Sequence, residues 1–213
     1  MKPEQKWSGR GVDQAPANRF AATCAAPLVD EDVWWTVDDD APPQTTLRWE
    51  TQRSAIAYNA SPDLPFDRSL NPYRGCEHGC AYCFARPTHE YLDLSAGLDF
   101  ETQLIAKRDL DRGLARELAA DCYQPAPIAL GTATDIYQPV ERRLGLTRAL
   151  IATLADARHP FVVTTKSAAV RRDVDLIAPE AAAGRAGVLM SICTLDRDLA
   201  RRLEPRATTP ARR

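Results

Sequence analysis

The chain has 213 residues and a formal net charge of −2, with 26% charged and 45% hydrophobic residues. This length supports one well-packed core plus an extension, and the near-neutral charge gives no sign of a polyanionic partner. No apolar stretch of the signal-peptide kind follows Lys2, and no apolar run approaches the roughly 18 residues of a membrane helix. The sequence therefore predicts a cytoplasmic protein without a membrane segment.

The N-terminal part differs in composition from the rest. Acidic runs at 30–32 and 38–40, together with several prolines, predict a flexible acidic and proline-rich extension over residues 1–44. Trp34 and Trp35 lie between the acidic runs, and we interpret them as part of a short segment docked on the domain surface.

Residues 45–66 form a lead-in to the core domain. A strand is expected over Thr45–Trp49, where apolar and polar residues alternate. A turn-rich linker is expected over Ser61–Pro65, because it holds two prolines and an aspartate. We expect the core domain to span residues 67–213.

The core alternates short apolar runs with amphipathic helical patterns. Strands are expected at Arg68–Asn71, Pro127–Gly131, Phe161–Thr165 and Gly187–Ile192. Helices are expected at Leu110–Ala120, Leu146–Ala157 and Val170–Ala182. This alternation predicts an α/β fold with a parallel sheet covered by helices.

The C-terminal end of the pattern suggests an incomplete sheet. The last expected strand, Gly187–Ile192, is apolar on both faces, which is typical of a central strand and not of an edge. A helix is expected to begin at Leu199, and prolines at 205 and 210 prevent it from continuing. We therefore expect a truncated core that leaves an apolar strand at its edge.

Three of the six cysteines are clustered in one short segment. Cys76, Cys80 and Cys83 follow each other at spacings of four and three residues. One loop with this spacing can wrap a cubane iron–sulfur cluster, whose irons bind thiolates. Three ligands leave one iron open, as a catalytic metal site does. Gly75 and Gly79 allow the positive φ angles that such a tight loop needs.

Other uses of these cysteines stay open. A zinc site would need a fourth ligand, which His78 or His89 could supply. A ferredoxin-type cluster would need a fourth cysteine, for which Cys122 is the remote candidate. A disulfide framework is disfavoured, because clustered cysteines in a chain without a secretion signal more often bind metal.

The pattern Cys76-x-x-x-Cys80-x-x-Cys83 resembles the signature of the radical S-adenosylmethionine superfamily. The wider segment 67–91 is similar to the branch of spore photoproduct lyase, which is also called DNA repair photolyase-like. The resemblance covers residues 45–213. It implies a partial (β/α) barrel of the TIM type, here truncated at the C-terminus, with the cysteine loop after the first strand.

The resemblance implies a [4Fe–4S] cluster and S-adenosylmethionine as cofactors. In this superfamily the cofactor chelates the open iron and receives one electron, and the resulting 5′-deoxyadenosyl radical takes a hydrogen atom from the substrate. It further implies a reductant such as flavodoxin or ferredoxin as a partner. The branch implies a lyase reaction on a nucleic acid substrate.

The resemblance also implies which residues hold S-adenosylmethionine. Tyr82, in the aromatic position before the third cysteine, would pack near the adenine. Thr134 and Asp135 follow an expected strand and would hold the methionine and ribose parts, although they could instead cap a turn. Lys166 would pair with the carboxylate, the alternative being a solvated lysine. Ser191 is a candidate for the ribose.

Three features depart from the branch or suggest other functions. Spore photoproduct lyase has a hydrogen-donating cysteine after its second strand, whereas the matching place near Thr132 holds none. The same cysteines could serve a non-catalytic iron–sulfur or zinc-binding module. The arginine-rich stretch 197–213 could instead mark a nucleic-acid-binding fragment.

Overall fold

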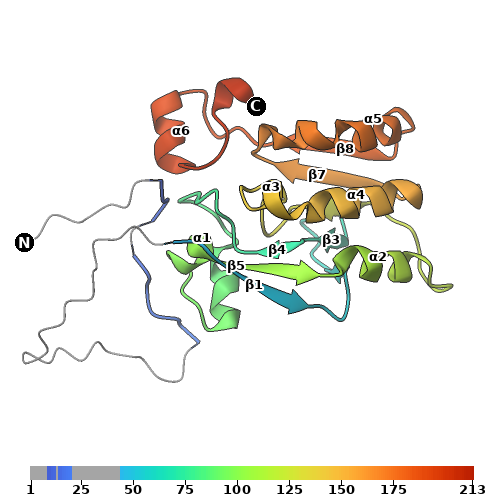
Figure 1. Cartoon of the computed structure of the whole chain (residues 1–213), viewed down its shortest axis with the longest axis horizontal. Helices are drawn as coiled ribbons and strands as arrows, with labels where there is room; N and C mark the ends of the chain where they lie inside the picture. Colours follow the sequence, from blue (N-terminus) through green and yellow to red (C-terminus); the bar gives the residue numbers. More distant parts are fainter. Residues whose placement is uncertain (1–8, 13, 21–43) are drawn as a thin grey trace, which may run out of the picture.

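The structure is a computed structural model that describes residues 9–12, 14–20 and 44–213 (Figure 1). The acidic runs and Trp34 and Trp35 of the expected N-terminal extension lie outside the described residues. No helix in the described part of the chain is long and apolar enough to cross a membrane.

The larger sheet has five strands in the order β2-β3-β6-β7-β8. The strands from β3 to β8 run parallel, and β2 pairs antiparallel with β3. The bounds are Ala57–Tyr58 (β2), Arg68–Leu70 (β3), Ile128–Leu130 (β6), Phe161–Thr165 (β7) and Ala186–Met190 (β8). The four expected core strands are thus confirmed within a residue or two.

A smaller sheet has the order β1-β5-β4. Its strands are Thr46–Thr51 (β1), Gln103–Arg108 (β5) and Tyr73–Arg74 (β4). β1 runs parallel to β5, and β4 runs antiparallel to β5. The expected strand near Thr45–Trp49 is therefore confirmed, whereas β5 was not expected from the sequence. The fold is α/β with mixed sheets, and the described strands do not close into a barrel.

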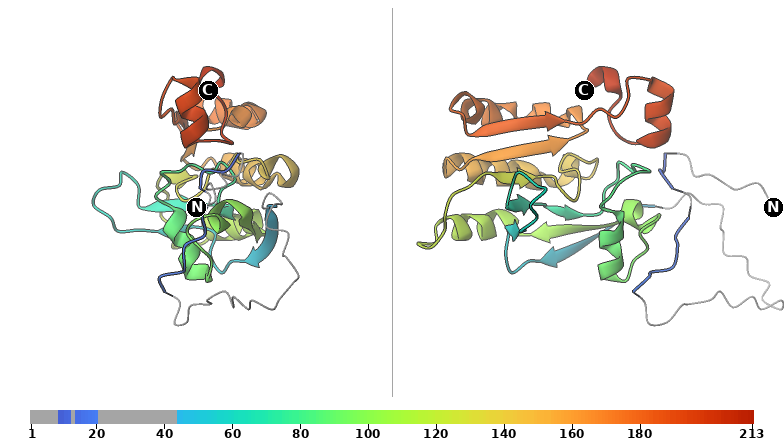
Figure 2. Two further views of the ribbon diagram at one scale, coloured as in Figure 1. Left: turned by 90° about the vertical axis from the view of Figure 1, so that its left-hand side faces the viewer. Right: turned by 180° about the vertical axis from the view of Figure 1, so that it is seen from behind.

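Three helices lie side by side along one face of the larger sheet (Figures 1 and 2). They are α2 (Leu110–Leu118), α4 (Leu146–Asp156) and α5 (Val174–Ala182). Their apolar faces pack on the strands in one core, which includes Leu114, Ile151 and Phe161. The expected helix Val170–Ala182 is divided, because a 3₁₀ turn at Ala168–Asp173 precedes α5.

The remaining helices are short. They are α1 (Asp99–Thr102), α3 (Glu141–Leu144), α6 (Arg197–Leu203) and 3₁₀ turns at Arg86–Leu92 and Pro210–Arg212. α6 and the final turn lie near the carboxyl ends of β7 and β8 (Figure 1). β8 forms the edge of the described sheet and leaves Val188 and Leu189 exposed, as the sequence predicts.

Two described pieces of the N-terminal part contact the core. Gly11 N donates to Glu101 Oε2 over 3.0 Å. Leu98 N donates to Gln14 O over 3.0 Å. These contacts place residues 9–12 and 14–20 against the segment that follows the cysteine loop.

Candidate active site

A cavity of about 360 Å³ lies at the carboxyl ends of the parallel strands. The eight residues that the sequence analysis assigns to the cluster and to S-adenosylmethionine all line it: Cys76, Cys80, Tyr82, Cys83, Thr134, Asp135, Lys166 and Ser191. They come from four separate segments of the chain. The structure therefore brings the selected residues together, and their roles toward a metal or cofactor stay predictions.

The sheet explains why residues far apart in sequence meet here. β6, β7 and β8 are parallel, so the segments after Leu130, Thr165 and Met190 leave the sheet at the same edge. At the end of β6 the chain turns through Gly131, which has φ +84°. A Cβ atom at this position would lie 2.5 Å from Thr164 O, so only glycine fits the turn.

The cysteine loop, which we define as residues 75–85, follows β4 directly and forms one wall of the cavity. Cys76 and Cys80 are buried and Cys83 is partly buried. Gly75 and Gly79 adopt φ +79° and φ +64°, which confirms the expected positive angles. Cys76 N donates to Phe100 O over 2.9 Å, and this bond anchors the start of the loop.

Burial and the neighbouring Cys76 affect the ionisation of the other two cysteines of the loop. Burial raises the pKa of the Cys80 thiol, and the nearby Cys76 raises it further. Burial also raises the pKa of Cys83, again with a contribution from Cys76. Among residues 9–12, 14–20 and 44–213, no group of three or more His, Cys, Asp or Glu side chains is already gathered as a metal-binding site. The thiols thus share a cavity wall without forming a closed ligand set.

His78 connects the cysteine loop to the end of β6. It is buried, and its Nδ1 lies 3.2 Å from Asp135 Oδ2, within ion-pair distance although not aligned as a hydrogen bond. Burial opposes protonation, but the Asp135 carboxylate outweighs it and raises the pKa of His78. Burial would raise the pKa of Asp135, but His78 and its hydrogen-bond donors lower it. The pair is therefore stable as imidazolium and carboxylate.

The polar groups of Thr134 and Asp135 are engaged within the protein. Thr134 Oγ1 donates to Gly75 O over 2.6 Å and accepts from Gln138 Nε2 over 2.9 Å. Asp135 Oδ1 accepts from Tyr137 N over 2.9 Å, which is the turn-capping geometry named as the alternative. The bond from Thr134 to Gly75 fastens the loop after β6 to the cysteine loop.

Asp135 also holds the end of β7. Its Oδ1 accepts from Thr165 Oγ1 over 2.7 Å, and its Oδ2 accepts from Lys166 N over 2.7 Å. The buried carboxylate therefore fixes the backbone from which the Lys166 side chain projects.

The ammonium group of Lys166 is paired within the protein. Nζ lies 3.3 Å from Glu204 Oε1 and 5.5 Å from the centre of the Tyr82 ring. The Tyr82 hydroxyl donates to the same Glu204 oxygen. The Lys166 side chain is only 23% exposed, so it is not the freely solvated lysine of the alternative interpretation.

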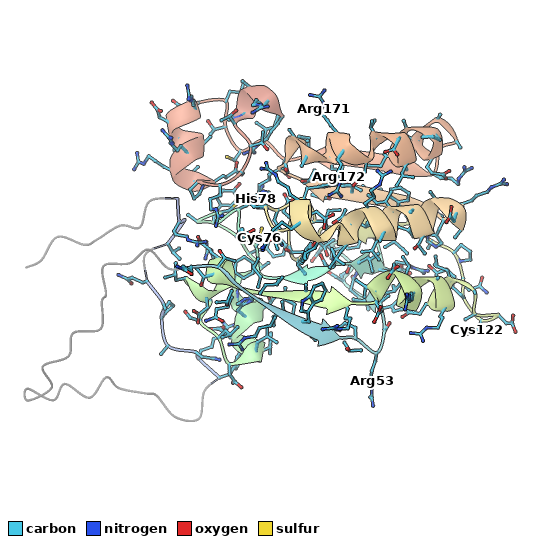
Figure 3. All side chains as sticks on the ribbon, viewed as in Figure 1. Arg53, Cys76, His78, Cys122, Arg171 and Arg172 are labelled. Carbon is cyan, nitrogen blue, oxygen red and sulfur yellow. The ribbon has the colours of Figure 1, made fainter. Side chains whose placement is uncertain are left out.

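Sequence reasoning missed Glu204, Gln138 and the role of His78 beside Asp135. Glu204 and Tyr82 are 122 residues apart, so no local pattern could link them. The two remote candidates for a fourth ligand do not line the cavity: His89 Nε2 is 2.9 Å from Gln103 O, and Cys122 is exposed at the other end of the molecule from Cys76 (Figure 3).

Two arginines of the C-terminal stretch face inward. Arg206 Nη2 lies 3.3 Å from Glu77 Oε1, and Arg213 Nη2 lies 2.6 Å from Glu204 Oε2. The Arg213 side chain is 1% exposed. These two side chains therefore stabilise the segment over the cysteine loop and are not part of a solvated basic face.

Comparison with known proteins adds relatives without an assigned activity. No protein-family model and no solved structure matches the chain. Uncharacterized proteins of Mycobacterium tuberculosis and Mycobacterium bovis are 43% identical over 150 residues, which are 70% of this chain and 44% of each relative. An uncharacterized protein of Methanocaldococcus jannaschii is 28% identical over 107 residues, which are 50% of this chain and 38% of the relative. The chain thus spans less than half the length of these relatives.

Proposed function

We propose that this chain is the core of a radical S-adenosylmethionine enzyme. One observation carries the proposal: the three cysteines and the strand-end residues chosen for the cofactor line a single cavity. The parallel strands β3, β6, β7 and β8 would then belong to a partial barrel of the TIM type. In such barrels the active site lies at the carboxyl ends of the strands, where this cavity is found.

The donor chemistry fits a [4Fe–4S] cluster held by Cys76, Cys80 and Cys83. Thiolates are the ligands that such clusters take, and three of them leave one iron open. Burial and mutual repulsion oppose ionisation of Cys80 and Cys83, and a bound cation reverses that preference. When bound, the cluster supplies an electron to S-adenosylmethionine at the open iron.

The side chains around the cysteine loop would bind and orient the second cofactor. Lys166 would receive the carboxylate of S-adenosylmethionine, and Ser191 would face its ribose. The ring of Tyr82 would pack on the adenine. Leu64 and Phe66 line the same cavity, and their apolar side chains would exclude water from the reacting atoms.

We further propose a small electron-transfer protein, flavodoxin or ferredoxin, as the reductant and a nucleic acid as the substrate class. Phe84 follows Cys83 directly, and its side chain is 82% exposed at the cavity. Arg201 and Arg202 are exposed on α6, next to the cysteine loop, where they would contact phosphates.

Anaerobic reconstitution with iron and sulfide tests the cluster assignment. We expect about four irons per chain, because a cubane cluster holds that number. Cys80→Ala should lose the cluster, whereas Cys122→Ala, which removes an exposed cysteine outside the cavity, should retain it. Reduced protein should then cleave S-adenosylmethionine slowly to 5′-deoxyadenosine and methionine. A chain that retains stoichiometric zinc and no iron would overturn the proposal.

A non-catalytic zinc site is the second candidate, because His78 is buried and lines the same cavity as the three cysteines. A Cys₃His set would close a tetrahedral zinc site. His78→Gln should then abolish zinc binding. Under the iron–sulfur proposal the same variant should retain iron, since the three thiolates alone hold the cluster.

A further inference from the structure

One buried carboxylate connects three segments around the cavity. The Glu204 side chain is 0% exposed, its Oε1 lies 3.3 Å from Lys166 Nζ, and the Tyr82 hydroxyl donates to it. Its Oε2 lies 2.6 Å from Arg213 Nη2. Arg213 in turn donates to Ser191 O over 2.9 Å. Glu204 thereby links the cysteine loop, the end of β7 and the end of β8.

We infer that Glu204 is a positioning residue of this site, which holds the Lys166 ammonium and the Tyr82 ring in place for S-adenosylmethionine. The inference rests on the proposed function. Glu204 does not line the cavity itself, so it acts through these two neighbours. The segment after α6 then contributes to the binding site through Glu204.

The charges around Glu204 support this role. Lys166 and Arg213 carry two positive charges against the single negative charge of Glu204. The group keeps one net positive charge, which matches a single carboxylate of the cofactor. Glu204 therefore orders Lys166 without neutralising the whole group.

Conformational entropy gives a second reason to assign Glu204 a positioning role. A lysine side chain has four rotatable bonds. Holding that side chain in one geometry costs entropy at the moment of binding. The contact with Glu204 fixes the ammonium before the cofactor arrives, which is how preorganisation raises affinity. The Tyr82 ring, 5.5 Å from the ammonium, is fixed by the same carboxylate.

Chemical labelling of lysines tests the positioning without any cofactor. The chain has only four lysines, Lys2, Lys6, Lys107 and Lys166, so mass spectrometry can follow each one. In the chain before iron and sulfide are added, trace acetylation of Lys166 should become severalfold faster in Glu204→Gln, measured against Lys107 in the same sample. Glu180→Gln is the matched control, because Glu180 pairs with Arg185 at 2.6 Å outside the cavity.

Binding of S-adenosylmethionine, measured by equilibrium titration of the cluster-loaded chain, gives the second readout. Glu204→Gln should weaken binding about tenfold, as expected for loss of a charge-assisted contact. In a Lys166→Gln background the same change should have little further effect, since Glu204 acts through Lys166. Arg213→Gln removes the guanidinium that competes with Lys166 for Glu204, so it should slow the labelling of Lys166. This change runs in the opposite direction, and it can be measured even if Glu204→Gln folds poorly.

Unchanged labelling of Lys166 in Glu204→Gln, or equal changes in Glu180→Gln, would overturn the inference. Failure of the wild-type chain to bind S-adenosylmethionine would instead count against the proposed function. The two failures are therefore distinguishable, because labelling reports on the Glu204 contact with no cofactor present.

Discussion

His78 Nδ1 lies 3.2 Å from Asp135 Oδ2, and both side chains are buried. The pair joins the cysteine loop to the segment after β6. Because Asp135 also accepts hydrogen bonds from Thr165 and Lys166, one carboxylate fixes the relative positions of three segments. Removing that charge should disturb all of them together.

Asp135→Asn should lower the free energy of unfolding by about 3 kcal/mol, because His78 loses its charged partner and the donors of Thr165 and Lys166 lose their carboxylate acceptor. Urea denaturation of the protein without metal measures the loss. Asp175→Asn is the control, since Asp175 pairs with Arg148 at the surface. The control should change stability little, and equal losses in both variants would contradict the prediction.

Lys107 on β5 should make stability depend on pH. Partial burial, with a contribution from Arg74, lowers the pKa of Lys107 from 10.5 to about 8. Between these values the unfolded chain binds a proton that the folded chain does not. The free energy of unfolding contributed by Lys107 should therefore rise as pH increases from about 8 to 10.5.

Lys107→Met isolates this contribution from the other groups that titrate in the same range. Denaturation curves of both proteins across pH 8 to 10.5 should show a gap that changes with pH. The variant should be the more stable protein at the lower end of the range, and its advantage should shrink toward the upper end. A constant gap would show that Lys107 has an ordinary pKa in the fold.

Gly131→Ala should destabilise the protein by about 2–5 kcal/mol, from left-handed strain plus overpacking. Its φ is +84°, and the added Cβ would lie 2.5 Å from Thr164 O, a backbone atom that cannot move aside cheaply. Gly145→Ala is matched in φ, +67°, but its Cβ meets nothing within 4 Å, so it should cost about 1–2 kcal/mol. Urea denaturation that ranks the two variants equally would contradict this account.

Under the proposed function, Lys166→Ala should weaken binding of S-adenosylmethionine by about 1.5–3 kcal/mol, the value of a hydrogen bond to a charged group. The fold should survive, because Glu204 keeps its contacts with Tyr82 and Arg213. Calorimetric titration of the cluster-loaded chain measures the change. Wild-type affinity in the variant would mean that another group receives the carboxylate.

Much of the fold follows from short-range sequence patterns. β7 and β8 are bounded apolar runs, and α4 has apolar residues at helical spacing, so local periodicity is sufficient to predict them. β5 was not predicted, because only Leu104 and Ala106 of its six residues are buried. The resulting alternation of buried and exposed residues is too short to recognise. The division before α5 falls at Asp173, whose φ of −106° and ψ of 17° depart from helical values, while Ser167 caps the preceding 3₁₀ turn.

The residues of the candidate site also divide into those that a local sequence pattern predicts and those that it does not. Its cysteines lie in one motif, Lys166 follows an expected strand and Ser191 lies near the end of another, so strand order alone brings them to one edge. Gln138 and Glu204 lack such a signal, because their importance comes from contacts with Glu77 and Tyr82 across the fold. Tertiary structure decides these partners, and a single sequence does not display them.

The contacts that the C-terminal segment makes with the cysteine loop can form only late in synthesis of the chain. Ala81 N donates to Leu203 O over 2.9 Å, and Arg206 reaches Glu77 across 129 residues of chain. When the cysteines leave the ribosome, the residues that will hold their loop have not yet been made. Contacts of such long sequence separation form late. The cysteine loop is therefore held in its final position only after residue 206 has been made.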